Sequence, residues 1–514
     1  MKYDKVILTN KTALDLKYKT DSKFIIAALN KLVQADATKN LKSKLILLDD
    51  KTTMNAINVN RVRQFNDAEQ VKIAIDGIYS KLSPDYILLV GGTEIIPHVR
   101  LTNPCYDPND DIDRFIYSDL PYACNTAYST SASAFTSPVR VVGRIPDITG
   151  IKNPDNLIKL IQNSINNIPR KKTVYDSIFG LSAKIWEKST NLSLSNITGS
   201  PTPAKTCPPF NHTTASHGDA ELGSMMHFIN CHGAGNTPEF YGQRDRTDGS
   251  FPVSFITTDV VNKITYAAMV AVECCYGAQL YYASTANEIP ICNNYLLHGA
   301  LAYVGSTNIA YGPAVGNGLA DLITQYFLRK AKEGASIGRA FLEARLDFLE
   351  DAQPDLDAEE LKTLAQFVLY GDPSVCLVEE QVSPDSDSFA PKTQKTIEQN
   401  QRKNRRYRLM EKGLQLGISI GIPKKTNKPK SASASALLRT AINTALKENN
   451  FEKSNAKVYI IKKPTHSAGK SASRKVEFHT YSKTKKVGKV INIEKLVLKV
   501  VNSDIVGIRK YVSK

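Results

Sequence analysis

Two segments of the chain contain residues suited to thiol chemistry. In Met226–Asn236 (MHFINCHGAGN), an apolar run leads into His232, and in Ala267–Gly277 (AAMVAVECCYG), a second apolar run leads into Cys274. A cysteine attacks as its thiolate, and a nearby imidazole can take the proton and later return it to a leaving amine. The pattern therefore predicts Cys274 as a nucleophile and His232 as its acid–base partner.

The same segments supply backbone donors for the oxyanion that such an attack creates. Glycine after the histidine allows close backbone approach, so we expect the amides of Gly233 and Cys274 to hold the oxygen. One such donor is typically worth about 3–4 kcal/mol of the reaction barrier.

Each of these residues also has a simpler interpretation. Cys274 alone could be a buried structural thiol, and His232 could be a satisfied core histidine. We interpret Cys275 as structural, because a neighbouring residue at a strand end faces elsewhere. Cys231-His232 and Cys274-Cys275 lack the spacing of zinc ligands, so no metal is predicted. Gly233-Ala-Gly235 lacks the lysine and hydroxyl of a phosphate-binding loop.

The elements around these segments predict an α/β fold. Short, nearly continuous apolar runs are typical of parallel strands buried on both faces, and they occur at Lys44–Leu48, Tyr86–Val90, Val139–Val142, Ser177–Leu181, Met226–Asn230, Ala267–Val272 and Ala302–Gly305. Helical patterns alternate with them at Ser22–Gln34, Ala68–Ser83, Asp155–Ile168, Leu319–Glu333 and Ile337–Glu350. This alternation favours a mainly parallel sheet flanked by helices, with ligands bound beyond the carboxyl ends of the strands.

Composition places the chain among globular proteins. Its 514 residues are 42% hydrophobic and 23% charged, and no apolar run reaches the length that spans a bilayer. The N-terminal residues do not resemble a secretory signal, so we expect a cytoplasmic protein; a secreted one would need a leader. Eight scattered cysteines do not suggest a disulfide framework, and we expect them to be free thiols.

Charge is divided unevenly along the chain. Residues 391–514, called the tail here, hold 30 Lys and Arg against 7 Asp and Glu, a net charge of +23. Residues 1–390 have a net charge of −7, so the total of +16 is a property of the tail. This asymmetry suggests a basic module attached to a mildly acidic catalytic body.

We expect four regions along the chain. They are an N-terminal α/β subdomain (1–170), a catalytic subdomain (171–380), a basic flexible linker (381–435) and a small basic α+β domain (436–514). In the last, Ala436–Glu448 has the pattern of a helix, and Lys457–Ile461, Lys475–Tyr481 and Val487–Val501 have the pattern of strands.

The order of several motifs resembles the caspase-like cysteine proteases, and among them the gingipain-like family. The His-Gly and Glu-Cys segments share the family's arrangement, and Cys274 is followed by two residues and a glycine. Further similar stretches are Val90–Pro97 (VGGTEIIP), Ser118–Ala123 (SDLPYA), Val142–Pro146 (VGRIP), Gly299–Asn308 (GALAYVGSTN) and Tyr370–Ser374 (YGDPS). The resemblance covers residues 1–378 and leaves the tail unexplained.

The resemblance implies a caspase-like fold and a preference for Arg or Lys before the scissile bond. Candidate substrate-binding residues are Glu187, Ser306, Asn308 and Tyr311; the alternative is that they are ordinary loop residues. Some members use an acidic residue to orient the histidine, but the matching position here is Lys184, with Glu187 nearby. No metal or organic cofactor is required, although calcium could support such a fold.

We therefore expect a regulated cysteine endopeptidase that works through an acyl-enzyme on protein substrates. Basic specificity would make Arg402–Arg408, in the linker, a site of self-cleavage. The alternative is a protease-like scaffold whose basic tail binds nucleic acid or an anionic partner through phosphate contacts. A structural pseudoenzyme is a third possibility, and it would be indifferent to substitution of Cys274.

Overall fold

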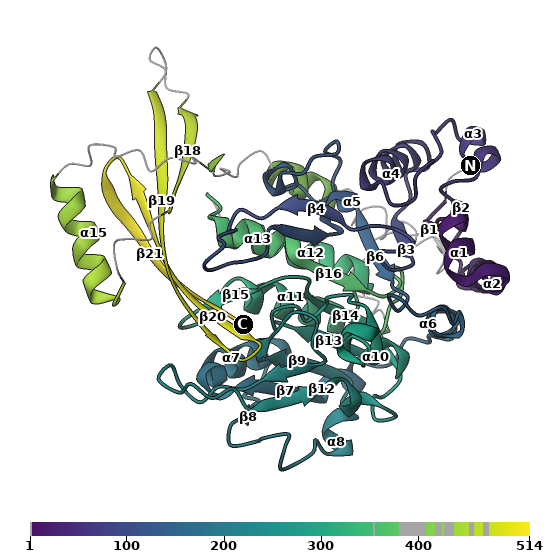
Figure 1. Ribbon diagram of the computed structural model, residues 1–514. Helices are drawn as coiled ribbons and strands as arrows, with labels where there is room; N and C mark the ends of the chain where they lie inside the picture. The colour runs from purple at the N-terminus through teal and green to yellow at the C-terminus, as the bar shows by residue number, and fades with distance from the viewer. Residues whose placement is uncertain are drawn as a thin grey trace, which may run out of the picture.

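The computed structural model describes residues 3–352, 355–379, 408–416, 424–425, 436–451, 457–465 and 472–514. Its centre is a ten-stranded sheet in the order β2-β1-β3-β6-β16-β14-β13-β9-β7-β8 (Figure 1). The strands are β1 (Lys5–Thr9), β2 (Ser43–Leu47), β3 (Tyr86–Val90), β6 (Val141–Ile145), β7 (Ile178–Ala183), β8 (Lys205–Cys207), β9 (Met226–Asn230), β13 (Ala268–Val272), β14 (Ala300–Ser306) and β16 (Phe367–Tyr370).

The sheet consists of two parallel blocks that meet at one antiparallel pair. Strands β2, β1, β3, β6 and β16 run parallel to one another, as do β14, β13, β9, β7 and β8. Strands β14 and β16 are antiparallel, with Tyr303 opposite Tyr370. The predicted α/β fold with a mainly parallel sheet is confirmed, and one sheet joins the two predicted subdomains.

Helices flank this sheet in two groups. In the first, α2 (Ser22–Thr38) packs on α6 (Asp155–Ile165), which also contacts α10 (Ile291–Leu297). In the second, α11 (Ala320–Lys332) lies between α7 (Glu187–Thr198) and α12 (Ile337–Asp351). The remaining helices of the body are α1 (Lys11–Tyr18), α3 (Lys51–Ala56), α4 (Ala68–Leu82), α5 (Leu120–Ala123), α8 (Asp219–Leu222), α9 (Ala283–Ala286) and α13 (Ala358–Gln366).

The local sequence explains these elements. Every residue of β3, β6, β9 and β13 is buried, as strands covered on both faces require. Helix α4 begins after Asp67, whose carboxylate accepts hydrogen bonds from the amides of Glu69 and Gln70.

Two of the family-like motifs are structural. The Asp119 carboxylate receives two hydrogen bonds from the Arg144 guanidinium, at 2.6 and 2.8 Å, and both side chains are buried. Arg144 also donates to the carbonyl oxygens of Gly91 and Ile96. In the YGDPS turn, the Asp372 carboxylate lies 2.5 Å from the ammonium of Lys5 on β1.

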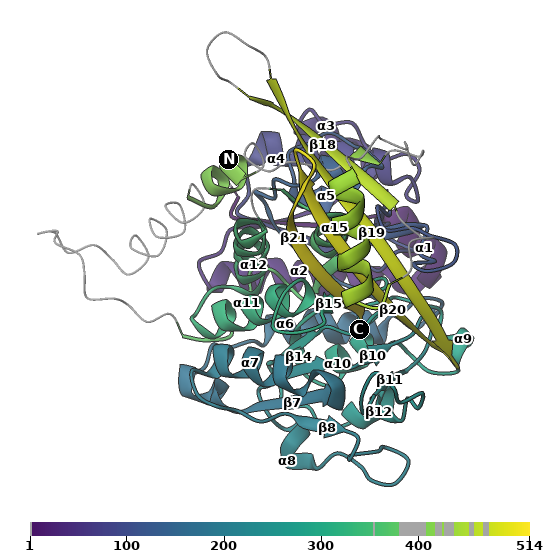
Figure 2. The same ribbon diagram turned by 90° about the vertical axis from the view of Figure 1, so that its left-hand side faces the viewer.

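The tail forms a small antiparallel sheet covered by a helix. Strands β17 (Lys424–Lys425), β18 (Lys457–Thr465), β19 (Ala472–Val487), β20 (Val490–Val501) and β21 (Asp504–Ser513) pair in that order. Helix α15 (Ala436–Glu448) packs on one face through Leu438, Ile442 and Leu446 (Figure 2). The predicted small C-terminal domain is therefore present. Sequence reasoning missed β21 and the hairpin turn between β19 and β20.

The tail sheet docks onto the body rather than standing apart from it. Side chains including Phe478, Ile493 and Val497 join the core of the body. Strand β15 (Tyr311–Pro313) of the body pairs with β21, so that it extends the tail sheet by one strand. Within the predicted linker, residues 408–416 form a helix with Leu409 and Leu416 buried.

No helix in the described part of the chain combines the length and the hydrophobicity that crossing a bilayer requires.

The Arg144–Asp119 pair should be essential for stability. Arg144→Ala leaves the Asp119 carboxylate buried without its partner, so we expect unfolding to become easier by about 3–5 kcal/mol in denaturant titrations. Arg61→Ala, at an exposed position, is the control and should change stability by less than about 0.5 kcal/mol. Equal stability of the two variants would contradict a structural role for this motif.

Candidate active site

The His-Gly and Glu-Cys segments meet at the carboxyl ends of two neighbouring strands. Strands β9 and β13 are adjacent and parallel, with Ile229 opposite Val272. His232 and Gly233 form the short strand β10, which pairs with β11 (Glu239–Tyr241). Strand β11 in turn pairs with β12 (Val253–Ile256). The two segments therefore meet beyond the ends of the strands, as the sequence predicts.

Gly233 is the point of closest approach between the two segments. A Cβ atom added to it would lie 1.8 Å from the carbonyl oxygen of Cys275 and 3.2 Å from Cβ of Cys274. Only glycine leaves room for this contact, and the backbone amide of Gly233 is thereby brought beside the cysteine segment.

His232 is buried and held in one tautomer. Its Nε2 lies 2.8 Å from Oε1 of Gln243, an acceptor, so Nε2 carries the hydrogen and donates it. Nδ1 is then the basic nitrogen; it is buried and has no hydrogen-bond partner among the described residues. The rings of Trp186 and Phe251 pack against the imidazole, with centroids 4.4 and 5.0 Å away.

This environment favours the neutral imidazole. Burial lowers the pKa of His232 to about 4; the hydrogen bond with Gln243 opposes the shift, and the nearby Lys514 ammonium adds to it. The side chain that orients the histidine is thus the amide of Gln243, which lies between strands β11 and β12. Neither Lys184 nor Glu187, the positions considered from the sequence, occupies that place, because these two form an ion pair with each other at 2.6 Å.

Cys274 faces the backbone of β9. Its Sγ accepts a hydrogen bond from the amide of Cys231 at 3.4 Å and lies 3.9 Å from the carbonyl oxygen of Ile229. Burial raises the pKa of the Cys274 thiol well above its ordinary value. Cys274, the nucleophile expected from the sequence, thus has its thiol against the backbone of the neighbouring strand.

Cys275 lies on the side where the last residue of the chain, Lys514, is bound. The Cys275 amide donates to the carbonyl oxygen of Lys514 at 2.9 Å, and the Gly233 amide donates to the same oxygen at 3.4 Å. The Cys275 Sγ accepts a hydrogen bond from the amide of Ala310 at 3.3 Å. The carbonyl of Ala310 in turn accepts one from the Lys514 amide at 3.0 Å. Two amides beside a thiol and converging on one carbonyl oxygen have the geometry of an oxyanion hole.

The side chain of Lys514 fills a closed acidic pocket. Its Nζ lies 3.0 Å from Oδ1 of Asp321, 3.2 Å from Oε2 of Glu273 and 3.1 Å from Oδ1 of Asn230. All four side chains are completely buried. Burial opposes the charge, but the carboxylates of Asp321 and Glu273 outweigh it and raise the pKa of Lys514.

Two further residues shape this pocket. A Cβ added to Gly312 of β15 would lie 2.1 Å from Cε of Lys514, so glycine leaves the space through which the lysine stem passes. The ammonium lies 4.7 Å from the ring centroid of Trp186, close enough for a cation–π contact. Trp186 therefore borders both the histidine and the acidic pocket.

The predicted substrate-binding residues have different places. Glu187 is paired with Lys184 at the start of α7, and its described contacts do not include Lys514. Ser306 and Asn308 brace the loop after β14: the Ser306 hydroxyl donates to the Asn308 carbonyl, and the Asn308 amide donates to the Phe115 carbonyl. Tyr311 contributes its backbone, which pairs with Ser513, while its hydroxyl donates to Asp111.

Among the described residues, no group of three or more His, Cys, Asp or Glu side chains is arranged to hold a metal ion.

Comparison with known proteins gives one family match, to peptidase family C25, over residues 226–378. The matched region includes His232, both adjacent cysteines and Asp321. The fold and this match define a cysteine-type peptidase. The resemblance to the gingipain-like proteases is thereby confirmed for this region, since family C25 is the gingipain family.

Solved structures that match the chain include one described as "Structure of Protease", with a TM-score of 0.48, 12% identity, and coverage of 98% of this chain and 96% of that chain. Two structures of the Saccharomyces cerevisiae separase–securin complex match with TM-scores of 0.28 and 0.29 and 16% identity. Each match covers 46% of this chain and 14% of the other. No curated protein sequence matches the chain.

Sequence reasoning missed Gln243, Trp186 and Asp321. Gln243 lies in the hairpin after His232, and Asp321 lies in the first turn of α11, 47 residues after Cys274. Neither has a local pattern that marks it. Glu273 stands beside Cys274 in the sequence, and a carboxylate at the end of a predicted strand could have indicated a cation-binding pocket.

The role of Gln243 can be tested by the titration of His232. In Gln243→Glu a carboxylate replaces the amide, which favours the imidazolium, so we expect the pKa of His232 to rise by about 1–3 units. The measurement is an NMR pH titration of the imidazole, with His232→Asn to assign the signal. Gln279→Glu changes charge at a neighbouring loop without touching the imidazole and should leave the pKa within a few tenths of a unit. An unchanged pKa in Gln243→Glu would contradict the assigned contact.

Proposed function

We propose that the protein is a cysteine endopeptidase that cleaves after lysine, with Cys275 as nucleophile and His232 as acid–base partner. One observation carries the proposal: a lysine residue is held with its carbonyl oxygen between the amides of Gly233 and Cys275. Its ammonium is held at the same time by Asp321 and Glu273. This is the placement that the residue before a scissile bond needs for attack by the neighbouring thiol.

The proposed reaction uses only groups of this site. Nδ1 of His232 takes the thiol proton as Sγ of Cys275 bonds to the carbonyl carbon, and the carbonyl electron pair moves to the oxygen between the two amides. The oxyanion collapses, the carbon–nitrogen bond breaks, and His232 gives its proton to the leaving amine. Water then attacks the thioester: His232 takes its proton and returns it to the departing thiolate, releasing the carboxylic acid product.

The resting pair is neutral in the closed site. Burial raises the pKa of the Cys275 thiol to about 12, although Ala310's amide and the Lys362 ammonium oppose this, and the pKa of His232 is about 4. At neutral pH the thiol therefore keeps its proton and the imidazole is free to accept it. Proton transfer accompanies attack, and no thiolate–imidazolium pair needs to exist beforehand.

The pocket favours lysine over arginine. The ammonium donates hydrogen bonds to Asn230 and Asp321, and an oxygen of Glu273 lies 3.2 Å from it, so three oxygens converge on one compact cation. A guanidinium is planar, broader and longer in reach, so it does not match three acceptors converging on one point.

Self-cleavage in the linker is part of the proposal, and a lysine-selective pocket would direct it to Lys403 within Arg402–Arg408. Of Arg402–Arg408, only Arg408 belongs to the described residues, at the start of the helix 408–416. All eight cysteines are free thiols, and a reducing compartment such as the cytoplasm suits the proposed chemistry.

The alternative, binding of nucleic acid through the tail, has less to favour it. Two basic side chains of β20 are already paired with carboxylates of the body: Lys495 with Glu359 at 2.9 Å, and Lys499 with Asp355 at 2.9 Å. These two ammonium groups are therefore neutralised within the protein and are not free to contact phosphates.

The two cysteines can be separated by substitution. Cys275→Ala should reduce hydrolysis of a lysine-reporter peptide by at least about 1000-fold, because it removes the nucleophile. Cys274→Ala is the matched control; it removes only a buried thiol and should cost less than about tenfold in kcat/KM. The opposite ranking would show that Cys274 is the nucleophile.

The pocket carboxylate Asp321 should govern specificity. Asp321→Asn removes a carboxylate that faces the substrate ammonium, and we expect kcat/KM for lysine peptides to fall by about 100-fold through loss of about 3 kcal/mol. Peptides with norleucine, which keeps the stem without the charge, should be affected less than tenfold. An equal loss for both peptides would mean that Asp321 acts only on folding.

A further inference from the structure

One strand of the tail lies along the body as an extended peptide substrate would. Strand β21 is antiparallel to β15, with Ser513 opposite Tyr311 and Val512 opposite Gly312. Beyond the paired residues, the Lys514 amide donates to Ala310 and the Ala314 amide donates to Lys510, at 3.0 and 2.9 Å. Strand addition of this kind is a common way to bind an extended peptide.

The side chains of this segment alternate between the site and the tail. Lys514 enters the acidic pocket, and Val512 packs against Ala183 and Trp186 beside it. Ser513 points back into the tail, where its hydroxyl accepts from the amide of Ile493 at 2.8 Å. The segment therefore gives the body two side chains and a paired backbone, as a strand with a period of two residues does.

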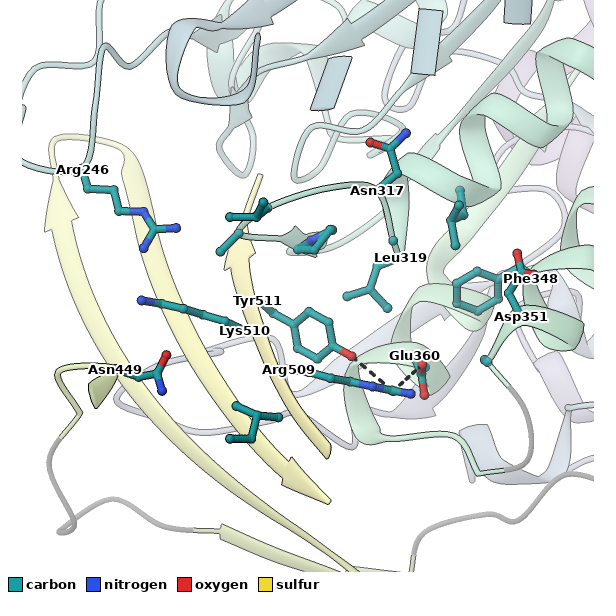
Figure 3. A pocket seen from close by; sticks show the side chains of 17 residues that line it. Arg246, Asn317, Leu319, Phe348, Asp351, Glu360, Asn449, Arg509, Lys510 and Tyr511 are labelled. Atoms are coloured by element: carbon teal, nitrogen blue, oxygen red, sulfur yellow. Dashed lines mark hydrogen bonds and ion pairs between the residues drawn. The ribbon is translucent and has the colours of Figure 1, made fainter. Parts of the chain in front are cut away.

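Ion pairs anchor the strand next to the site. The Arg509 guanidinium lies 2.5 Å from Glu360 (Figure 3). It also lies 2.9 Å from Asp357, and the Tyr511 hydroxyl donates to Asp357 at 2.8 Å. These two carboxylates belong to the start of α13. An open pocket of about 600 Å³ lies beside this part of β21. The position next to the cysteine and histidine is filled by the strand itself.

We infer that residues 511–514 are an internal ligand of the protease site, bound as the acyl half of a substrate, so that the resting enzyme is closed by its own chain. The inference rests on the proposed function and adds its regulation and its preferred sequence. The site recognises Tyr-Val-Ser-Lys, with the lysine before the scissile bond, and an added peptide can bind only when β21 leaves.

The expected strength of this closure follows from tethering. A segment held by a short connection has an effective concentration in the millimolar range, whereas substrates commonly have KM values of micromolar to millimolar order. Occupancy by the tethered segment should therefore weaken binding of an added peptide by about 10- to 100-fold.

Binding can be measured without turnover. A fluorescein-labelled Tyr-Val-Ser-Lys peptide is titrated, by fluorescence anisotropy, into Cys275→Ala and into Cys275→Ala with Lys514→Glu. The glutamate places a third carboxylate in the acidic pocket and should expel the strand, so we expect the double variant to bind at least tenfold more tightly. Equal affinity, or no binding to either protein, overturns the inference.

Turnover gives an independent test with a matched control. With Cys275 intact, Lys514→Glu should raise kcat/KM for a Tyr-Val-Ser-Lys reporter amide by about 10- to 100-fold. Lys514→Ala is a milder variant in case the glutamate disturbs folding, and it should change activity in the same direction. Lys447→Glu makes the same charge change on the exposed face of α15 and should have no effect.

Failure of the inference and failure of the proposed function give different results. If the wild type already hydrolyses the peptide and neither substitution at Lys514 raises the rate, the closure is refuted while the protease proposal stands. If the released variants bind the peptide but retain equal turnover after Cys275→Ala, the closure stands and the proposed nucleophile is wrong.

Discussion

A lysine ammonium completely buried between two carboxylates is the interaction around which this site is organised. Removing such an ion from water costs several kcal/mol unless its partners are well placed, and Asp321, Glu273 and Asn230 are arranged to meet that cost. The same demand fixes the backbone of Lys514, whose carbonyl oxygen then reaches the amides of Gly233 and Cys275. In the proposed reaction, charge recognition and the position of the reacting carbon are therefore linked through one residue.

The scaffold provides the precision that this link needs. Strands β9 and β13 are fully buried and end side by side, so the residues after them are held close together. Gly233 and Gly312 remove the two Cβ atoms that would block the approach of the cysteine segment and of the lysine stem. Ion pairs between the basic tail and the acidic start of α13 then hold β21 in place. The uneven charge of the chain therefore contributes to docking of the tail on the body.

Much of the fold could be predicted from the sequence, because parallel strands buried on both faces have a strong apolar pattern. The tail domain was also visible in outline. Strand β21 was not, since its charged residues and Gly507 break the pattern and its burial arises only from docking. The two segments that the sequence singles out do meet in the fold, but the choice between Cys274 and Cys275 depends on which thiol faces the neighbouring strand. That is a property of packing, and Gln243 and Asp321 likewise come close to the site only in the folded chain.

The most direct test is to find which thiol reacts with a ligand aimed at this pocket. The protein is treated with the chloromethyl ketone of Tyr-Val-Ser-Lys, and the modified cysteine is identified by peptide mass spectrometry. The account predicts an adduct on Cys275, formed slowly in the wild type and at least tenfold faster in Lys514→Glu. An adduct on Cys274, or equal rates in the two proteins, would contradict it.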